Sequence, residues 1–157
     1  MSNKNRAVDI FKILFQTEFQ PETDTDELVE LYVGQNYHLN TPVAEGDEDD
    51  DSAVRADNKP EIEAEDVAFV KNKLSRIVEH LAEIDDRIES ESKGWKLERI
   101  GKAELAILRL SVYEILFEDE AVDAVTADVA VRLAKEYAEE KSSAFVNGIL
   151  GTIIRNK

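Results

Sequence analysis

The 157-residue sequence has no cysteine, six glycines and three prolines. Without cysteine there is no disulfide framework, no thiol nucleophile and no thiolate metal site. No stretch has the length of apolar residues that a membrane span needs, and the N-terminus lacks the apolar region of a secretory signal. Few helix breakers favour helix. We therefore expect a cytoplasmic, all-α protein that forms a single domain over residues 1–157.

Basic residues are outnumbered by acidic ones. The chain has 19 Lys and Arg against 35 Asp and Glu, which gives a net charge of −16. A negative protein repels phosphates, so this balance opposes non-specific nucleic-acid binding. The charge is uneven, because residues 44–66 hold eleven acidic residues against Arg55 and Lys59, whereas residues 142–157 hold Arg155 and Lys157 and no acid.

Apolar residues recur at helical spacing along most of the chain. Residues 61–89 show the clearest pattern, with steps of three and four from Val67 to Ile88. Three such heptads can form a coiled coil, but among other amphipathic helices they favour a bundle. No alternating strand pattern of useful length is present. The expected helices are 4–19, 25–37, 61–89, a short turn at 95–100, 102–118, 123–139, and a last helix from Ser142 or Ser143.

An acidic segment separates the second and third expected helices. Residues 40–60 combine Pro42, Gly46 and a run of aspartates without apolar periodicity, which predicts a flexible loop. A calcium-binding EF-hand is the alternative interpretation of the aspartates. The spacing disfavours it, because Ser52 and Asn58 occupy the positions that require glycine and glutamate.

The sequence contains no catalytic motif of the common classes: no Walker loop, no nucleophile elbow and no dinucleotide fingerprint. His38 and His80 lie outside the spacings typical of metal sites. Neighbouring acids such as Asp85 and Asp86 diverge on a helix and are more simply solvated charges than an acid/base pair. We expect no enzyme activity, no cofactor and no metal.

The dipeptide Asn147-Gly148 is typical of a tight turn, yet it lies within apolar residues spaced by four, Phe145, Ile149 and Ile153. A glycine within a helix costs about 1 kcal/mol relative to alanine. We interpret the pair as a point where another backbone crosses the last helix closely. Core packing alone is the alternative interpretation.

Three blocks in this order resemble the NusB family of transcription antitermination factors. They are "WKLERIGKAELAILRLSVYEIL" from Trp95, "VRLAKEY" from Val131 and "FVNGIL" from Phe145, and "LFQTE" in the first expected helix adds to the likeness. The resemblance is dense over residues 61–157 and thinner before them. It implies two antiparallel three-helix bundles packed together, with 1–39 and 61–89 in the N-terminal half and 95–157 in the C-terminal half.

The resemblance also implies a function. Members of the family bind boxA-type RNA together with the ribosomal protein NusE, and they promote transcription of ribosomal RNA operons within an RNA polymerase antitermination complex. By the family pattern, Lys4 and Arg6 map to phosphate contacts and Phe145 to a base contact. Phe15 and Glu104 map to the partner surface. Members exist as monomers and as dimers, so a homodimer is an open alternative.

The sequence departs from the family pattern in its basic residues. Family members usually begin the first helix with several arginines, whereas residues 1–18 here have a net charge of +1. Because phosphate contacts set affinity, we expect weak RNA binding by the chain alone and tighter binding with a basic partner. One rival is a protein-interaction module of the same fold with little RNA affinity. Another is a domain associated with an RNA methyltransferase, although no methyltransferase motif is present.

Overall fold

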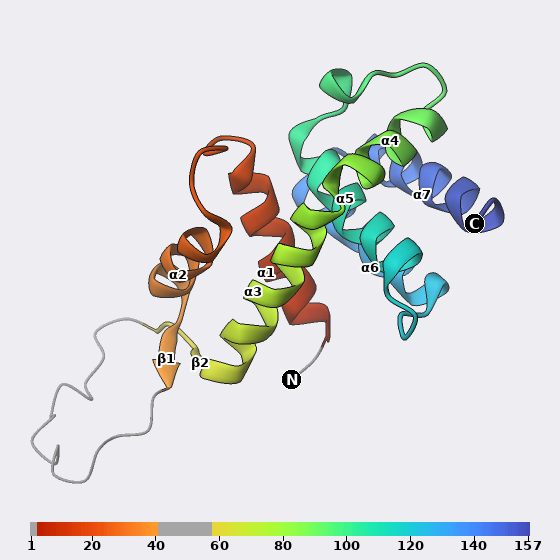
Figure 1. Cartoon of the computed structure of the whole chain (residues 1–157). Coiled ribbons are helices and arrows are strands. Elements are labelled where there is room, and N and C mark those ends of the chain that lie inside the picture. Colours follow the sequence, from red (N-terminus) through yellow and green to blue (C-terminus); the bar gives the residue numbers. More distant parts are fainter. Residues whose placement is uncertain (1–2, 41–57) are drawn as a thin grey trace, which may run out of the picture.

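The computed structural model describes residues 3–40 and 58–157, and the side chains of residues 3–5 are not included in that description. The described residues are mostly helical, which confirms the all-α prediction (Figure 1). None of their helices is long and apolar enough to cross a membrane. The elements are α1 (Asn3–Thr17), α2 (Thr25–Asn36), β1 (His38–Asn40), β2 (Glu61–Glu63), α3 (Ala64–Glu79), α4 (Leu81–Glu91), the 3-10 helix η2 (Leu97–Arg99), α5 (Lys102–Phe117), α6 (Asp123–Tyr137) and α7 (Glu140–Arg155).

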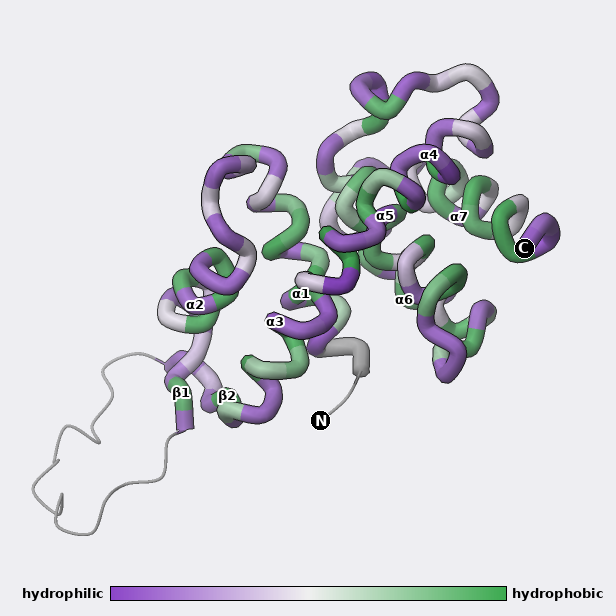
Figure 2. Tube along the Cα trace, in the orientation of Figure 1, coloured by the Kyte–Doolittle hydropathy of each residue, from purple (hydrophilic) through white to green (hydrophobic). Residues whose placement is uncertain are grey.

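Two groups of helices pack together, as Figure 1 shows: α1, α2 and α3 on one side, and α5, α6 and α7 with the shorter α4 on the other. Helix α5 lies at the centre and contacts helices of both groups. Its residues from Leu105 to Tyr113 are all buried, including Arg109 and Ser111. A helix that is buried on every side has apolar residues on all its faces. Figure 2 accordingly shows apolar residues along much of α5.

The segment predicted as one helix over residues 61–89 is divided in two. Residues 61–63 form β2, and the helix is interrupted at His80, whose φ of −101° and ψ of 12° depart from helical values. The prediction of a continuous helix is therefore wrong. The His80 ring stacks on Phe117 of α5 with 4.1 Å between centroids, and the redirected α4 packs on α5 and α7. The interruption thus lies where the chain leaves the first group of helices and joins the second.

Two three-residue strands form a small parallel sheet, which the sequence analysis did not predict. His38 pairs with Glu61 and Asn40 with Glu63, and the N–H of His38 donates to the carbonyl of Pro60 at 2.8 Å. Strands this short have too few residues to show an alternating pattern. The acidic loop predicted over residues 40–60 lies for the most part, from 41 to 57, outside the described residues.

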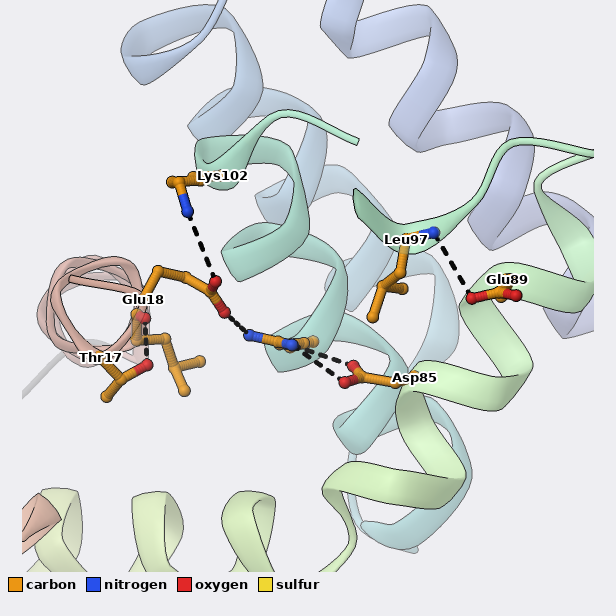
Figure 3. A network of polar contacts seen from close by, with 8 residues as sticks. Thr17, Glu18, Asp85, Glu89, Leu97 and Lys102 are labelled. Carbon is orange, nitrogen blue, oxygen red and sulfur yellow. Dashed lines mark hydrogen bonds and ion pairs between the residues drawn. The ribbon is translucent and has the colours of Figure 1, made fainter. Parts of the chain in front are cut away.

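A buried ionic network joins the two groups of helices (Figure 3). Arg109 of α5 donates from Nε and Nη2 to the two carboxylate oxygens of Asp85 in α4, both at 2.9 Å, and its Nη1 donates to Glu18. Burial lowers the pKa of Arg109, but the hydrogen bonds and charges of Asp85 and Glu18 outweigh that effect and raise it. The guanidinium is therefore a permanent charge that holds α1, α4 and α5 together.

Candidate RNA and partner interface

Lys4 and Arg6 lie in the first two turns of α1. Arg6 is only 7% exposed, and its Nη1 lies 3.1 Å from the Asp9 carboxylate. Its guanidinium carbon is 5.6 Å from the centre of the Tyr37 ring. The structure thus gives Arg6 a compensated, enclosed charge, whereas a phosphate contact requires an accessible one. Lys4 belongs to α1, but its side chain lies outside the described residues.

Asp9 is the centre of this enclosed polar cluster. It is 3% exposed and accepts hydrogen bonds from the hydroxyls of Tyr32 at 2.6 Å and Tyr37 at 2.8 Å. Burial, and next the hydrogen bond to Asp9, raise the pKa of Tyr37 to about 12, and the same causes raise the pKa of Tyr32. The cluster ties α1 to α2 and to the residue that precedes β1. Its geometry fits a structural role.

Phe15 belongs to a row of aromatic rings along α1. Phe11 and Phe19 lie one turn to either side of it, with centroids at 6.4 and 5.2 Å, and Tyr137 of α6 lies 5.2 Å from Phe11. Phe15 is partly buried, whereas Phe19 is 58% exposed. Two cations lie over this row, Lys12 over Tyr137 and Lys102 over Phe19, each at 5.3 Å from a ring centre. The exposed Phe19 ring next to Lys102 is suited to stacking on a base or on a partner's side chain.

Glu104 occupies the first turn of α5, where a carboxylate suits the positive end of the helix dipole. It accepts a hydrogen bond from the hydroxyl of Ser142 in α7 at 2.6 Å. The carboxylate folds back toward Gly101, where a Cβ atom would lie 1.9 Å from its Oε2. Glu104 is therefore fixed by its neighbours and remains partly exposed.

Phe145 and the Asn147-Gly148 pair lie within α7, so the pair is not a turn. Phe145 is partly buried and packs on the core, while Asn147 and Gly148 face outward. A Cβ atom at Gly148 would meet no atom within 4 Å. The interpretation that Gly148 permits a close helix crossing is thus wrong. Instead, Asn147 helps to line an open hollow of about 430 Å³ between α6 and α7, beside Lys135 and Ser143.

The structure gathers the two predicted partner residues at one end of the molecule. Phe15 lies near the C-terminus of α1 and Glu104 at the start of α5, and Lys102 links these two ends through Glu18, at 3.8 Å, and Phe19. Lys4 is eleven residues before Phe15, which is about 16 Å along the helix. The sequence analysis missed Phe19 and Lys102. The four-residue spacing of Phe15 and Phe19 was the available signal.

Within residues 3–40 and 58–157, no group of three or more His, Asp or Glu side chains is arranged to hold a metal ion. Two hollows in this part of the surface, between α6 and α7 and beside Trp95, are open. A third, of about 490 Å³, is lined by Arg6, Lys73 and Glu114, and the two side chains of Lys73 and Glu114 form an ion pair with each other. What the arrangement offers is a contact surface of aromatic rings, cations and one fixed carboxylate.

Comparisons with known proteins agree with this fold. The family model described as "NusB family" matches residues 9–155. The chain is 38% identical over 150 residues to the transcription antitermination protein NusB of Agathobacter rectalis, covering 96% of this chain and 97% of that protein. It is 46% identical over 96 residues to that of Clostridium acetobutylicum, covering 61% of this chain and 71% of that protein.

Solved structures show the same likeness. A T. maritima NusB structure superposes with a TM-score of 0.76 at 28% identity, covering 99% of this chain and 92% of that one. A structure of the antitermination factors NusB and NusE in complex with dsRNA superposes with a TM-score of 0.72, covering the whole of both chains. Its identity of 24% supports the shared fold alone.

Proposed function

Because the chain belongs to the NusB family, we propose that it is an RNA-binding transcription antitermination adaptor. In this proposal it binds boxA-type RNA together with NusE and promotes transcription of ribosomal RNA operons as part of an RNA polymerase antitermination complex. The observation that carries the proposal is the family match over nearly the whole chain. The proposal requires no enzymatic activity, and it assigns the protein to the cytoplasm, where transcripts are made.

In this proposal one surface contacts RNA and a second contacts the protein partner. We assign RNA contacts to Lys4 and Phe145, and partner contacts to Phe15 and Glu104. Arg6 contributes through its ion pair with Asp9, which fixes the first turns of α1. Glu104 and Ser142 are joined by a hydrogen bond, so the partner surface is anchored to the start of the helix that carries Phe145.

The charge balance makes the partner essential to the proposal. At −16 the chain repels RNA overall, and few cations are available for phosphates. A basic protein such as a ribosomal protein is attracted to an acidic surface and supplies positive charge to the complex. RNA binding is therefore a property of the heterodimer more than of this chain alone.

Fluorescence anisotropy of a labelled boxA-type RNA, with and without NusE, tests the proposal. We expect the affinity to rise at least about tenfold with NusE, which corresponds to about 1.4 kcal/mol. A scrambled RNA of equal length is the control. Equal affinity with and without NusE would contradict the adaptor function.

A variant of Phe145 tests the assigned RNA contact. Phe145→Ala should weaken RNA binding by about 5-fold or more if the ring stacks on a base, while helicity by circular dichroism stays near that of the parent. The matched control is Phe69→Ala, which removes a ring that is 45% exposed on α3. Unfolding of the Phe145 variant would assign the ring to the core.

A second candidate function is that of a protein-interaction module with little RNA affinity. The enclosed position of Arg6 and the net charge of −16 favour it. In that case NusE binds this chain, and the pair binds boxA-type RNA no better than NusE does alone.

A further inference from the structure

The loop between α4 and α5 holds its backbone in a fixed turn. Ser92, which is 3% exposed, accepts a hydrogen bond from the N–H of Trp95 at 3.2 Å, and its hydroxyl lies 2.6 Å from the Trp95 carbonyl oxygen. Lys93 and Gly94 complete the turn with φ values of 53° and 90°. The N–H of Leu97 donates to the Glu89 carboxylate at 3.4 Å (Figure 3). Contacts at both ends of the turn therefore set the position of Trp95.

This turn presents Trp95 to solvent. The residue is 53% exposed, and it borders a hollow of about 570 Å³ that Lys93, Lys96 and Arg99 also line. Figure 2 shows most residues of the loop as hydrophilic. An exposed indole with cations in the same loop, on a backbone held by hydrogen bonds, is a stacking platform for a base, because every base has a flat π-face.

The cations of the loop are available for a ligand. Lys93, Lys96 and Arg99 are exposed and form no ion pair with any carboxylate in the described part of the chain. The lysines of α3 differ in this respect: Lys71 pairs with Glu30 at 2.8 Å and Lys73 with Glu114 at 2.6 Å. Against three available cations, the segment from residue 93 to 99 has the single carboxylate of Glu98.

The loop is also continuous with the surface described above. Three residues after Arg99 comes Lys102, which lies over the Phe19 ring and pairs with Glu18. Cations therefore recur every three residues from 93 to 102, and they run toward the first turn of α5, where Glu104 lies.

We propose that the loop from Lys93 to Arg99 is an additional contact for single-stranded RNA, with the Trp95 indole stacked on a base and the neighbouring cations on phosphates. The proposal rests on the proposed RNA-binding function. An acidic protein would satisfy the cations equally well. A flat, exposed ring set between those cations favours a ligand that alternates anionic groups with stacking bases, which is the chemistry of a single strand.

Trp95 is the single tryptophan of the chain, so the tryptophan fluorescence of this chain reports on the surroundings of Trp95 alone. The probes are two labelled RNAs, a boxA-type RNA and the same RNA extended by single-stranded nucleotides at both ends, each titrated with and without NusE. Anisotropy measures binding, and indole fluorescence measures the Trp95 contact. The Trp95→Phe protein supplies the background, including any signal from NusE. We expect the extended RNA to quench Trp95.

Variants of Trp95 and of the neighbouring lysines measure how much this contact contributes to RNA affinity. Trp95→Ala should lower the affinity for the extended RNA by about 5-fold to 150-fold, whereas Trp95→Phe should retain most of that affinity. Lys93→Gln/Lys96→Gln should lower the slope of log affinity against log salt by about 1.4, since each phosphate contact on a single strand contributes about 0.7. The charge-matched control is Lys71→Gln/Arg76→Gln on α3, with an unchanged slope after correction for net charge.

The outcomes separate the two proposals. If the RNA binds but Trp95 fluorescence and the Trp95→Ala affinity are unchanged, this inference is wrong and the proposed function stands. If neither RNA binds in the presence of NusE, both are wrong. If Trp95→Ala weakens NusE binding in the absence of RNA, the loop is a protein contact and the inference is overturned.

Discussion

Arg109→Met is the substitution whose effect the structure specifies most closely. The Arg109 side chain is 10% exposed and forms three charged hydrogen bonds, two to Asp85 and one to Glu18. Methionine retains the apolar stem that packs within α5 and removes the guanidinium. The substitution therefore leaves two carboxylates facing each other between α1, α4 and α5, without the charge that compensates them.

The expected cost is about 3 kcal/mol. Charged hydrogen bonds contribute about 1.5–3 kcal/mol each, so the three have a gross value of about 5–9 kcal/mol. The Asp85 and Glu18 side chains are 19% and 22% exposed, so both regain part of their hydration once the arginine is absent. Breaking a buried pair from one side typically costs about 3–5 kcal/mol, and this partial exposure places the loss at the lower end.

Urea denaturation followed by circular dichroism measures this loss, and thermal melting should show a decrease in Tm of about 6–12 °C. The matched control is Arg132→Met, which breaks an i,i+4 pair with Asp128 whose side chains are 61% and 59% exposed. That pair is worth about 0.3–0.5 kcal/mol. Equal losses for the two variants would refute the reasoning. Replacing Glu18 and Asp85 by leucine together with Arg109→Met should recover stability, because no buried charge then remains in this network.

Three further outcomes follow from other contacts. Asp9→Asn should cost about 3 kcal/mol in urea denaturation, because Arg6 then remains buried without its counter-charge, and a loss below about 1 kcal/mol would contradict this. Burial and Asp9 raise the pKa of Tyr37 to about 12, so its stabilising effect is complete below pH 10 and is lost as the pH rises toward 12. Tyr37→Phe should make that part of the stability profile less steep, while the raised pKa of Tyr32 keeps part of the slope. Gly148→Ala should add about 1 kcal/mol, since its Cβ meets no atom within 4 Å, and a loss of stability would show an unrecognised contact there.

Helical periodicity identified the helices well because most have one buried stripe; α5, which is buried on every side, is the exception. Most boundaries fall within a few residues of the expected ones, as for α2 and α5. Periodicity failed at His80, because the apolar spacing continues from Ile77 to Ile84 across the residue at which the helix is interrupted. The stacking of His80 on Phe117, 37 residues away, accompanies that interruption, and a tertiary contact of this kind leaves no local signal.

The site was harder to predict than the fold, because a residue's position in a motif does not determine its exposure. The family pattern maps Arg6 to a phosphate contact, yet its side chain folds onto Asp9 and Tyr37. Gly148 was interpreted as a packing residue and is exposed. In both cases the missing information was the direction in which the side chain or helix face points.

The net charge of −16 opposes RNA binding overall, but it does not indicate where on the surface RNA can bind; that depends on which cations lack partners. Ion pairs engage Lys73 and Arg109 within the fold, so neither is available to phosphates. The cations near Trp95 have no such partner among the described residues, although they are few. An RNA strand responds mainly to charges within about 8–10 Å, which is the screening length near physiological salt. The net charge of the whole protein matters less. Local grouping of unpaired cations therefore decides where an acidic protein of this fold can bind a transcript.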